Sequence, residues 1–183
     1  IRKKVSVEGK HKKQSGGHGQ YGDVVMEFEP SGDLDTPYVF EEKIVGGVVP
    51  KNFFPAVEQG LRECMQKGVL AGYPVVNLAA NLYDGSYHDV DSNEISFKLA
   101  AAIAYREGLP KAQPVILEPV GSLKVYIPEN YVGDVMGDLN KRRGRVMGIE
   151  AADETGLQTV LAEVPYAEMT DYVISLRAAT QGR

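Results

Sequence analysis

The segment Ser15-Gly16-Gly17-His18-Gly19-Gln20-Tyr21-Gly22 lies between two stretches with the residue pattern of β-strands. Residues 3–14 and 21–29 are predicted strands, and in the second Val24, Met26 and Phe28 form the apolar face. The glycines between them favour a hairpin tip that lets other groups approach the backbone closely. At this tip His18 and Tyr21 offer stacking faces and Gln20 offers an amide, which are groups suited to RNA contact. An ordinary hairpin turn is the alternative explanation.

The same glycine spacing matches two nucleotide-binding motifs, but its surroundings exclude both. A dinucleotide fingerprint opens a helix, whereas the residues after Gly22 are strand-like. A kinase glycine-rich loop requires His-Arg-Asp and Asp-Phe-Gly motifs, and the chain has neither. The Walker A pattern is also absent. The chain is therefore predicted not to bind or hydrolyse nucleotide by itself.

A second segment, Gly85-Ser86-Tyr87-His88-Asp89-Val90-Asp91-Ser92, precedes a predicted helix. Asp91 and Glu94 have capping-box spacing, so the helix is predicted to begin there and to hold His88 in place. The helix is predicted to be broadly buried through its apolar residues, which are Ile95, Phe97, Leu99, Ala101, Ile103 and Ala104. His88 beside Asp89 could form an acid–base pair, but no second histidine has metal-ligand spacing. RNA contact, a solvated loop and catalysis are the alternatives for this segment.

Composition predicts a cytoplasmic protein with no bound metal. The 183 residues carry a net charge of −5, contain one cysteine, Cys64, and include no apolar run long enough to cross a membrane. Residues 1–22 are nevertheless basic, with only Glu8 opposing Arg2, Lys3, Lys4, Lys10, Lys12 and Lys13. This basic arm is suited to phosphate contact, although a solvated strand face explains the same charges.

A second unit is predicted after the proline-rich residues 108–122. Strand patterns at 123–127, 145–150 and 157–164 alternate with helical patterns at 130–143 and 166–178. The order β-α-β-β-α is a split-βαβ, ferredoxin-like pattern without its last strand, so the chain is predicted to be part of a longer protein. Lys141, Arg142 and Arg143 end the first helix, where they could complement the helix dipole or bind phosphate.

These segments together resemble the C-terminal part of bacterial elongation factor G over essentially the whole chain. The resemblance rests on Ser15–Gly22, on Leu70–Val75 with Gly85–Ser92, and on Gly133–Gly144 with Leu176–Arg183. It implies an α+β fold with two domains. Residues 1–119 would be domain IV, with the fold of domain 2 of ribosomal protein S5, and 120–183 would be a ferredoxin-like domain V lacking its last strand.

The resemblance also implies the role of a ribosomal translocase. The domain IV tip would contact the tRNA–mRNA duplex in the decoding site, and domain V would contact ribosomal RNA. The candidate RNA contacts are Gly16, Gly17, His18, Gly19, Gln20, Tyr21, His88, Lys12, Lys13, Arg142 and Arg143. His18 departs from the family pattern, because many members have arginine there.

The expected partners are ribosomal RNA, the tRNA–mRNA duplex and ribosomal proteins, with no membrane and a monomeric chain. This part of the protein is predicted not to be an enzyme. GTP and Mg²⁺ would belong to an N-terminal domain outside these residues. Two alternatives remain: a paralogue acting in ribosome recycling or tetracycline protection, and a small enzyme using His88 and Asp89.

Overall fold

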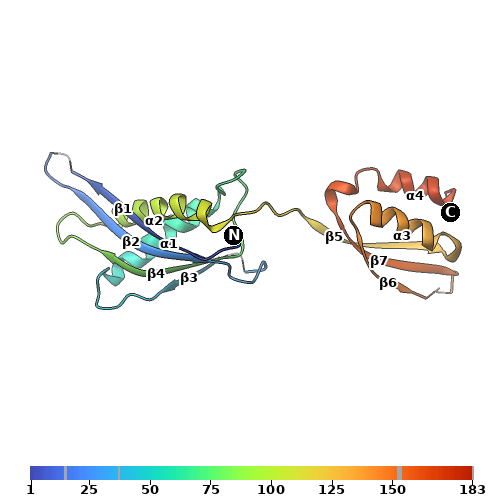
Figure 1. Ribbon diagram of the computed structural model, residues 1–183, viewed down its shortest axis with the longest axis horizontal. Coiled ribbons are helices and arrows are strands. Elements are labelled where there is room, and N and C mark those ends of the chain that lie inside the picture. The colour runs from blue at the N-terminus through green and yellow to red at the C-terminus, as the bar shows by residue number, and fades with distance from the viewer. Residues whose placement is uncertain (15, 37, 152–153, 183) are drawn as a thin grey trace. The chain divides into compact units, whose positions relative to one another are not determined.

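The computed structural model describes residues 1–14, 16–36, 38–151 and 154–182. It divides the chain into two compact units, Ile1–Ile116 and Leu117–Arg183, each with its own sheet and core (Figure 1). Ser15 of the first glycine-rich segment and Arg183 of the last quoted segment lie outside the described residues. No helix in the described part of the chain is long and apolar enough to span a membrane.

Unit 1 contains a four-stranded sheet with strand order β1-β2-β4-β3. Its strands are β1 (Val5–Lys13), β2 (Gln20–Glu29), β3 (Tyr38–Glu42) and β4 (Leu78–Ser86). Strand β3 is parallel to β4, and the other pairs are antiparallel. The two strands predicted around the glycine-rich segment are confirmed.

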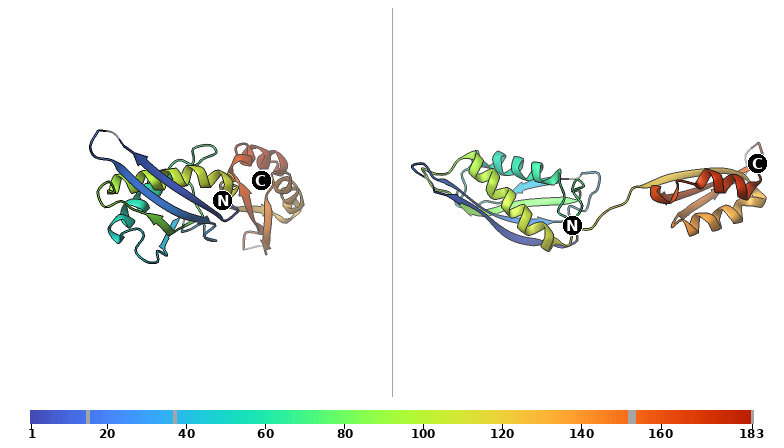
Figure 2. Two further views of the ribbon diagram at one scale, coloured as in Figure 1. Left: turned by 60° about the vertical axis from the view of Figure 1, so that its left-hand side comes forward. Right: turned by 90° about the horizontal axis from the view of Figure 1, so that it is seen from above.

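Two helices, α1 (Phe54–Met65) and α2 (Glu94–Gly108), cover one face of this sheet (Figure 2). Short 3₁₀ turns precede α1 at Lys51–Phe53 and follow α2 at Leu109–Ala112. The predicted apolar face of β2 is confirmed, because Val24, Met26 and Phe28 are fully buried beneath the helices. Alternation of apolar and polar residues thus decides which face of the sheet receives the helices.

The predicted cap and buried face of α2 need correction. Asn93, and not Asp91, caps the helix: its Oδ1 accepts hydrogen bonds from Ser96 N (2.8 Å) and Ser96 Oγ (2.9 Å). Phe97, Ala101 and Ala104 are buried as predicted, but the side chains of Ile95 and Leu99 are exposed. Helix α2 instead faces Gly9 and Gly22 of the sheet, where small residues allow a close approach.

Unit 2 has the predicted order β-α-β-β-α. Its elements are β5 (Val120–Pro128), α3 (Val132–Lys141), β6 (Arg145–Glu150), β7 (Leu157–Pro165) and α4 (Tyr172–Thr180). The sheet has the order β5-β7-β6 and is antiparallel throughout. The predicted helix starts at 130 and 166 were too early, because 3₁₀ turns occupy Glu129–Tyr131 and Tyr166–Glu168. The predicted α+β class, with an S5 domain 2-like unit followed by a ferredoxin-like unit, is confirmed.

Candidate nucleic-acid interface

Two loops of unit 1 lie at the same end of its sheet. The glycine loop, defined as Gln14 with Gly16–Gly19, connects β1 to β2, and the histidine loop, Tyr87–Asn93, connects β4 to α2. Strands β2 and β4 are neighbours with Asp23 opposite Ser86, so the residues before one loop lie beside the residues after the other. The sheet register therefore brings the two segments singled out in the sequence together.

Three hydrogen bonds hold the histidine loop against the glycine loop and the start of β2. Gly19 N–H donates to Asp91 Oδ1 (3.0 Å), Tyr21 N–H donates to Asp91 O (2.9 Å), and Ser92 Oγ donates to Tyr21 O (2.8 Å). A Cβ at Gly19 would lie 2.7 to 2.9 Å from the Asp91 carboxylate atoms, which is too close for a real contact. A side chain at position 19 would therefore displace the Asp91 carboxylate. We call this group of contacts, Gly19 and Tyr21 with Asp91 and Ser92, the loop clasp.

A buried carboxylate supports the clasp from the sheet. Asp23 Oδ2 accepts hydrogen bonds from Ser86 Oγ (2.7 Å), Lys10 Nζ (3.2 Å) and Tyr21 OH (3.4 Å). The Lys10 ammonium also lies 5.4 Å from the Tyr21 ring centre. Hydrogen bonding to Tyr21 and Asp23 raises the pKa of Lys10, which keeps it cationic. Sequence reasoning missed Asp23 and Ser86, which the pairing of β2 with β4 places opposite each other.

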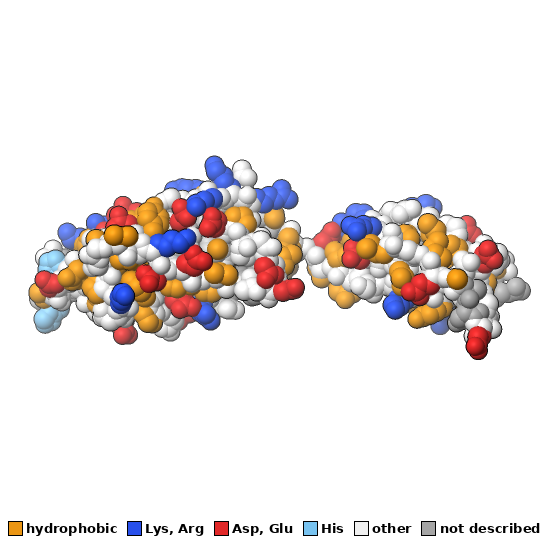
Figure 3. Space-filling model, turned by 90° about the horizontal axis from the view of Figure 1, so that it is seen from below, with side chains coloured by type: hydrophobic (Ala, Val, Ile, Leu, Met, Phe, Trp, Pro, Cys, Tyr) orange, Lys and Arg blue, Asp and Glu red, His pale blue; other side chains and the backbone are white. Residues whose placement is uncertain are grey.

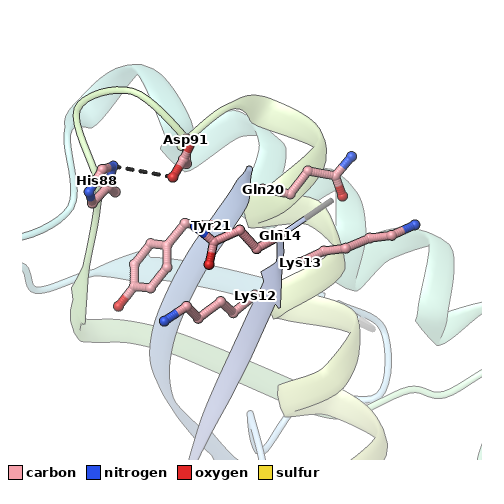
Figure 4. A pocket seen from close by; sticks show the side chains of 7 residues that line it. All are labelled: Lys12, Lys13, Gln14, Gln20, Tyr21, His88 and Asp91. Carbon is pink, nitrogen blue, oxygen red and sulfur yellow. Dashed lines mark ion pairs between the residues drawn. The ribbon is translucent and has the colours of Figure 1, made fainter. Parts of the chain in front are cut away.

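The clasp leaves both histidines of the loops accessible. His18 is exposed with Gly16 and Gly17, and the His88 side chain is 58% exposed. The His88 ring centre is 6.3 Å from that of Tyr21, and its Nδ1 is 3.6 Å from Asp91 Oδ2 (Figure 4). Figure 3 shows histidine side chains at this end of unit 1. Hydrogen bonds therefore fix the backbone of the loops, while the imidazole side chains of both histidines are exposed to solvent.

The basic arm divides into paired and unpaired lysines. Lys4 pairs with Glu27 and Glu29, and Lys10 pairs with Asp23. Within the described residues, Lys12 and Lys13 are exposed and have no ion-pair partner. Among the described residues, unpaired charges therefore lie next to the tip at Lys12 and Lys13, and at the other end of the arm at Arg2 and Lys3.

A hollow of about 170 Å³ lies between the loops (Figure 4). Gln20 at its edge is held by His11, whose Nε2 is 2.8 Å from Gln20 Oε1. Lysines, an imidazole and amides around one hollow can contact phosphates and base edges. The residues that line it are Lys12, Lys13, Gln14, Gln20, Tyr21, His88 and Asp91.

The adjacent arginines Arg142 and Arg143 of unit 2 differ in accessibility. Arg142 is only 12% exposed, and its guanidinium donates to Asp138, Asp171, Ser175 Oγ and the Glu168 carbonyl. Arg143 is 54% exposed and pairs with Glu118 and Glu168. These partners raise the pKa of both arginines, and Arg142 lowers the pKa of Asp171. Arg142 thus has a structural role that its i,i+4 spacing from Asp138 could have indicated.

The geometry around His88 differs from the acid–base pair considered in the sequence. Its carboxylate neighbour is Asp91, while Asp89 is exposed. In the described ranges, no group of three or more His, Cys, Asp or Glu residues is arranged to hold a metal ion.

Comparisons with known proteins cover the whole chain. Residues 1–113 match the family model described as elongation factor G, domain IV, and residues 115–183 match that described as elongation factor G C-terminus. A solved structure, the crystal structure of ttk003000868 from Thermus thermophilus, is 47% identical with a TM-score of 0.86. That similarity covers 100% of this chain and 27% of the Thermus chain, so the present chain spans about a quarter of the length of that protein.

Proposed function

The chain belongs to the elongation factor G family, and we propose that it supplies the RNA-contacting end of a ribosomal translocase. In this proposal the two loops of unit 1 contact the tRNA–mRNA duplex in the decoding site. Unit 2 contacts ribosomal RNA. The GTPase that drives the movement belongs to another part of such a factor.

The loop clasp is the observation that carries the proposal. It uses backbone groups and the Asp91 and Ser92 side chains to hold the loops, and leaves His18, His88 and the unpaired lysines exposed. A binding surface that is ordered beforehand loses less conformational entropy on contact with RNA. Imidazole and lysine side chains suit a partner with ribose hydroxyls, base edges and phosphates.

In unit 2 the structure favours Arg143 over Arg142 as the RNA contact. Arg143 is more than half exposed, and its partners Glu118 and Glu168 are themselves accessible. A phosphate could therefore exchange for one of these carboxylates at small cost. Arg142 would have to leave four intramolecular partners.

The test uses a full-length elongation factor G in which this 183-residue segment replaces the corresponding domains. We expect His88→Ala to slow translocation about tenfold, the kinetic equivalent of one hydrogen bond worth about 1.4 kcal/mol in the transition state. Ribosome-stimulated GTP hydrolysis should stay near the level of the unsubstituted chimera. Rapid kinetics of tRNA–mRNA movement and of phosphate release measure the two steps.

The control is Lys111→Ala, an exposed site in the turn Leu109–Ala112 at the opposite end of β1 from the loops. It should leave both steps unchanged. Normal translocation by the His88→Ala chimera would show that the tip does not act through this histidine, and the proposed role of His88 would be wrong.

A further inference from the structure

We propose that Asp91 is a positioning residue whose two carboxylate oxygens set the glycine loop and the His88 imidazole at the same time. Its effect on translocation rests on the function proposed above, whereas its effect on the loops can be measured in the 183-residue chain alone. No RNA partner is needed for that first measurement.

One oxygen of Asp91 fixes the glycine loop. Oδ1 accepts the Gly19 N–H, and the carboxylate occupies the space that a side chain at position 19 would fill. The Asp91 backbone oxygen accepts a second N–H, from Tyr21 near the start of β2. Asp91 therefore holds β2 and the glycine loop at two points, across 72 residues of sequence in the case of Gly19.

The other oxygen faces His88. Asp91 Oδ2 lies 3.6 Å from His88 Nδ1, within ion-pair distance (Figure 4). A negative oxygen beside Nδ1 favours the imidazole tautomer that carries its proton on Nδ1. The exposed Nε2 then has a free lone pair and accepts hydrogen bonds. The partner chemistry that fits is a donor on RNA, such as a ribose 2′-hydroxyl or a base amino group.

The helix cap does not account for this carboxylate. The cap of α2 is made by Asn93, and across the described ranges the one ion-pair partner of Asp91 is His88. Asp89, two residues earlier, is an exposed carboxylate with neither contact. It is the matched control, because its substitution removes the same charge from the same loop.

The decisive variant is Asp91→Asn. Its amide oxygen can still accept the Gly19 N–H, which then turns the amide NH₂ towards His88 Nδ1. An NH₂ group that approaches Nδ1 can only donate to it, which favours the tautomer with the imidazole proton on Nε2. The variant should therefore keep the glycine loop in place and invert the His88 tautomer. Asp91→Ala loses both contacts.

Nitrogen-15 NMR of the 183-residue chain separates these outcomes. The His88 ring-nitrogen shifts should report an Nδ1–H tautomer in the wild type and in Asp89→Asn, and an Nε2–H tautomer in Asp91→Asn. Hydrogen exchange of the Gly19 amide should accelerate about tenfold in Asp91→Ala, as expected for one lost hydrogen bond, and remain near the wild-type rate in the other two. Unchanged His88 shifts in Asp91→Asn, or unchanged Gly19 exchange in Asp91→Ala, would overturn the proposal.

The functional arm uses the translocation chimera. Asp91→Asn should slow translocation as His88→Ala does, and Asp89→Asn should not. Normal translocation by Asp91→Asn, with slow translocation by His88→Ala, would overturn the positioning role and leave the proposed function intact. Normal translocation by both variants would instead contradict the role of His88 in the proposed function, and the NMR result would still decide what Asp91 does to the loops.

Discussion

The two loops of unit 1 and the pair Arg142 and Arg143 of unit 2 were both predicted to contact RNA, and the two sites are held in place in opposite ways. At the clasp, backbone amides and the Asp91 and Ser92 side chains make the structural bonds, and the nearby Lys12 and Lys13 are unpaired. In unit 2, the cationic side chain itself makes the structural bonds, because Arg142 links α3 to the start of α4 through Asp138 and Asp171.

This difference shows that a basic residue is available to a partner only if the fold does not already use its charge. Lys12 and Arg142 look alike in sequence, as cations near the end of an element. The Lys12 side chain is exposed and unpaired, whereas the Arg142 side chain is only 12% exposed and has several partners. Four changes, from the largest expected effect to the smallest, separate the two modes of construction.

The largest effect is expected for Gly22→Ala in unit 1. The added methyl group would overlap the backbone of Ser96 and Phe97 in α2, so strand and helix must move apart. We expect a loss of about 3 kcal/mol in the unfolding free energy of unit 1. Hydrogen exchange of β2 amides measures it without interference from unit 2.

Gly137→Ala in α3 is the matched control for that change. Nothing lies within 4 Å of the added methyl group there, so the better helix propensity of alanine should stabilise unit 2 by about 0.5 kcal/mol. Equal effects of the two substitutions would contradict the close packing of β2 on α2.

The next largest effect is expected for Arg142→Ala in unit 2. It removes hydrogen bonds to Asp138, Asp171 and Ser175, of which Asp171 is well exposed, so we expect unit 2 to lose about 2 kcal/mol. Hydrogen exchange of β7 amides reports this, with the exposed neighbour Lys141→Ala as control. A variant with wild-type stability but weaker ribosome binding would make Arg142 an RNA contact after all.

Acid should weaken unit 2 through the same arginine. Arg142 holds the pKa of Asp171 below its ordinary value of 3.8, because its hydrogen bond and positive charge favour the carboxylate. The stabilisation is thus complete above about pH 4 and is lost as the pH falls through the lower, folded-state value. Unfolding of unit 2 followed from about pH 6 to pH 2 should show this decline. The decline should be shallower in Arg142→Ala, and identical slopes would argue against the ion pair.

Arg143→Ala should change stability least, because both partners of this exposed side chain are accessible to water. The substitution should instead affect the binding of the chimera to ribosomes. If Arg143 contacts phosphate, the chimera carrying this substitution should bind ribosomes more weakly, and that binding should depend less steeply on salt. Binding curves at several salt concentrations test this, and an unchanged salt slope would remove Arg143 from the interface.

Local pattern was enough to predict much of the fold. The alternation in residues 21–29 identified β2 and its buried face, and the order of elements identified the second unit. These features depend on neighbours two to four residues away, which the sequence displays directly. The proximity of the two loops could be expected only from the family resemblance, because it depends on the pairing of β2 with β4.

Side-chain partners were predicted less well, and Asp91 shows why. Its spacing from Glu94 suits a capping box, but Asn93 lies closer to the helix start and takes that role. Asp91 is then free to bond Gly19, a partner that only the folded sheet brings near. The predicted burial of Ile95 and Leu99 was wrong for a similar reason. Helix α2 contacts the sheet through small residues rather than through these bulky aliphatic ones.

The absence of a side chain at Gly19 has an evolutionary consequence. A methyl group there would collide with the carboxylate at position 91, so the two positions are constrained as a pair and should show epistasis in a mutational scan. Alanine at position 19 should be tolerated better when position 91 is also shortened. Anyone who exchanges tip loops between related factors must therefore transfer both segments together, because each carries half of one fitted contact.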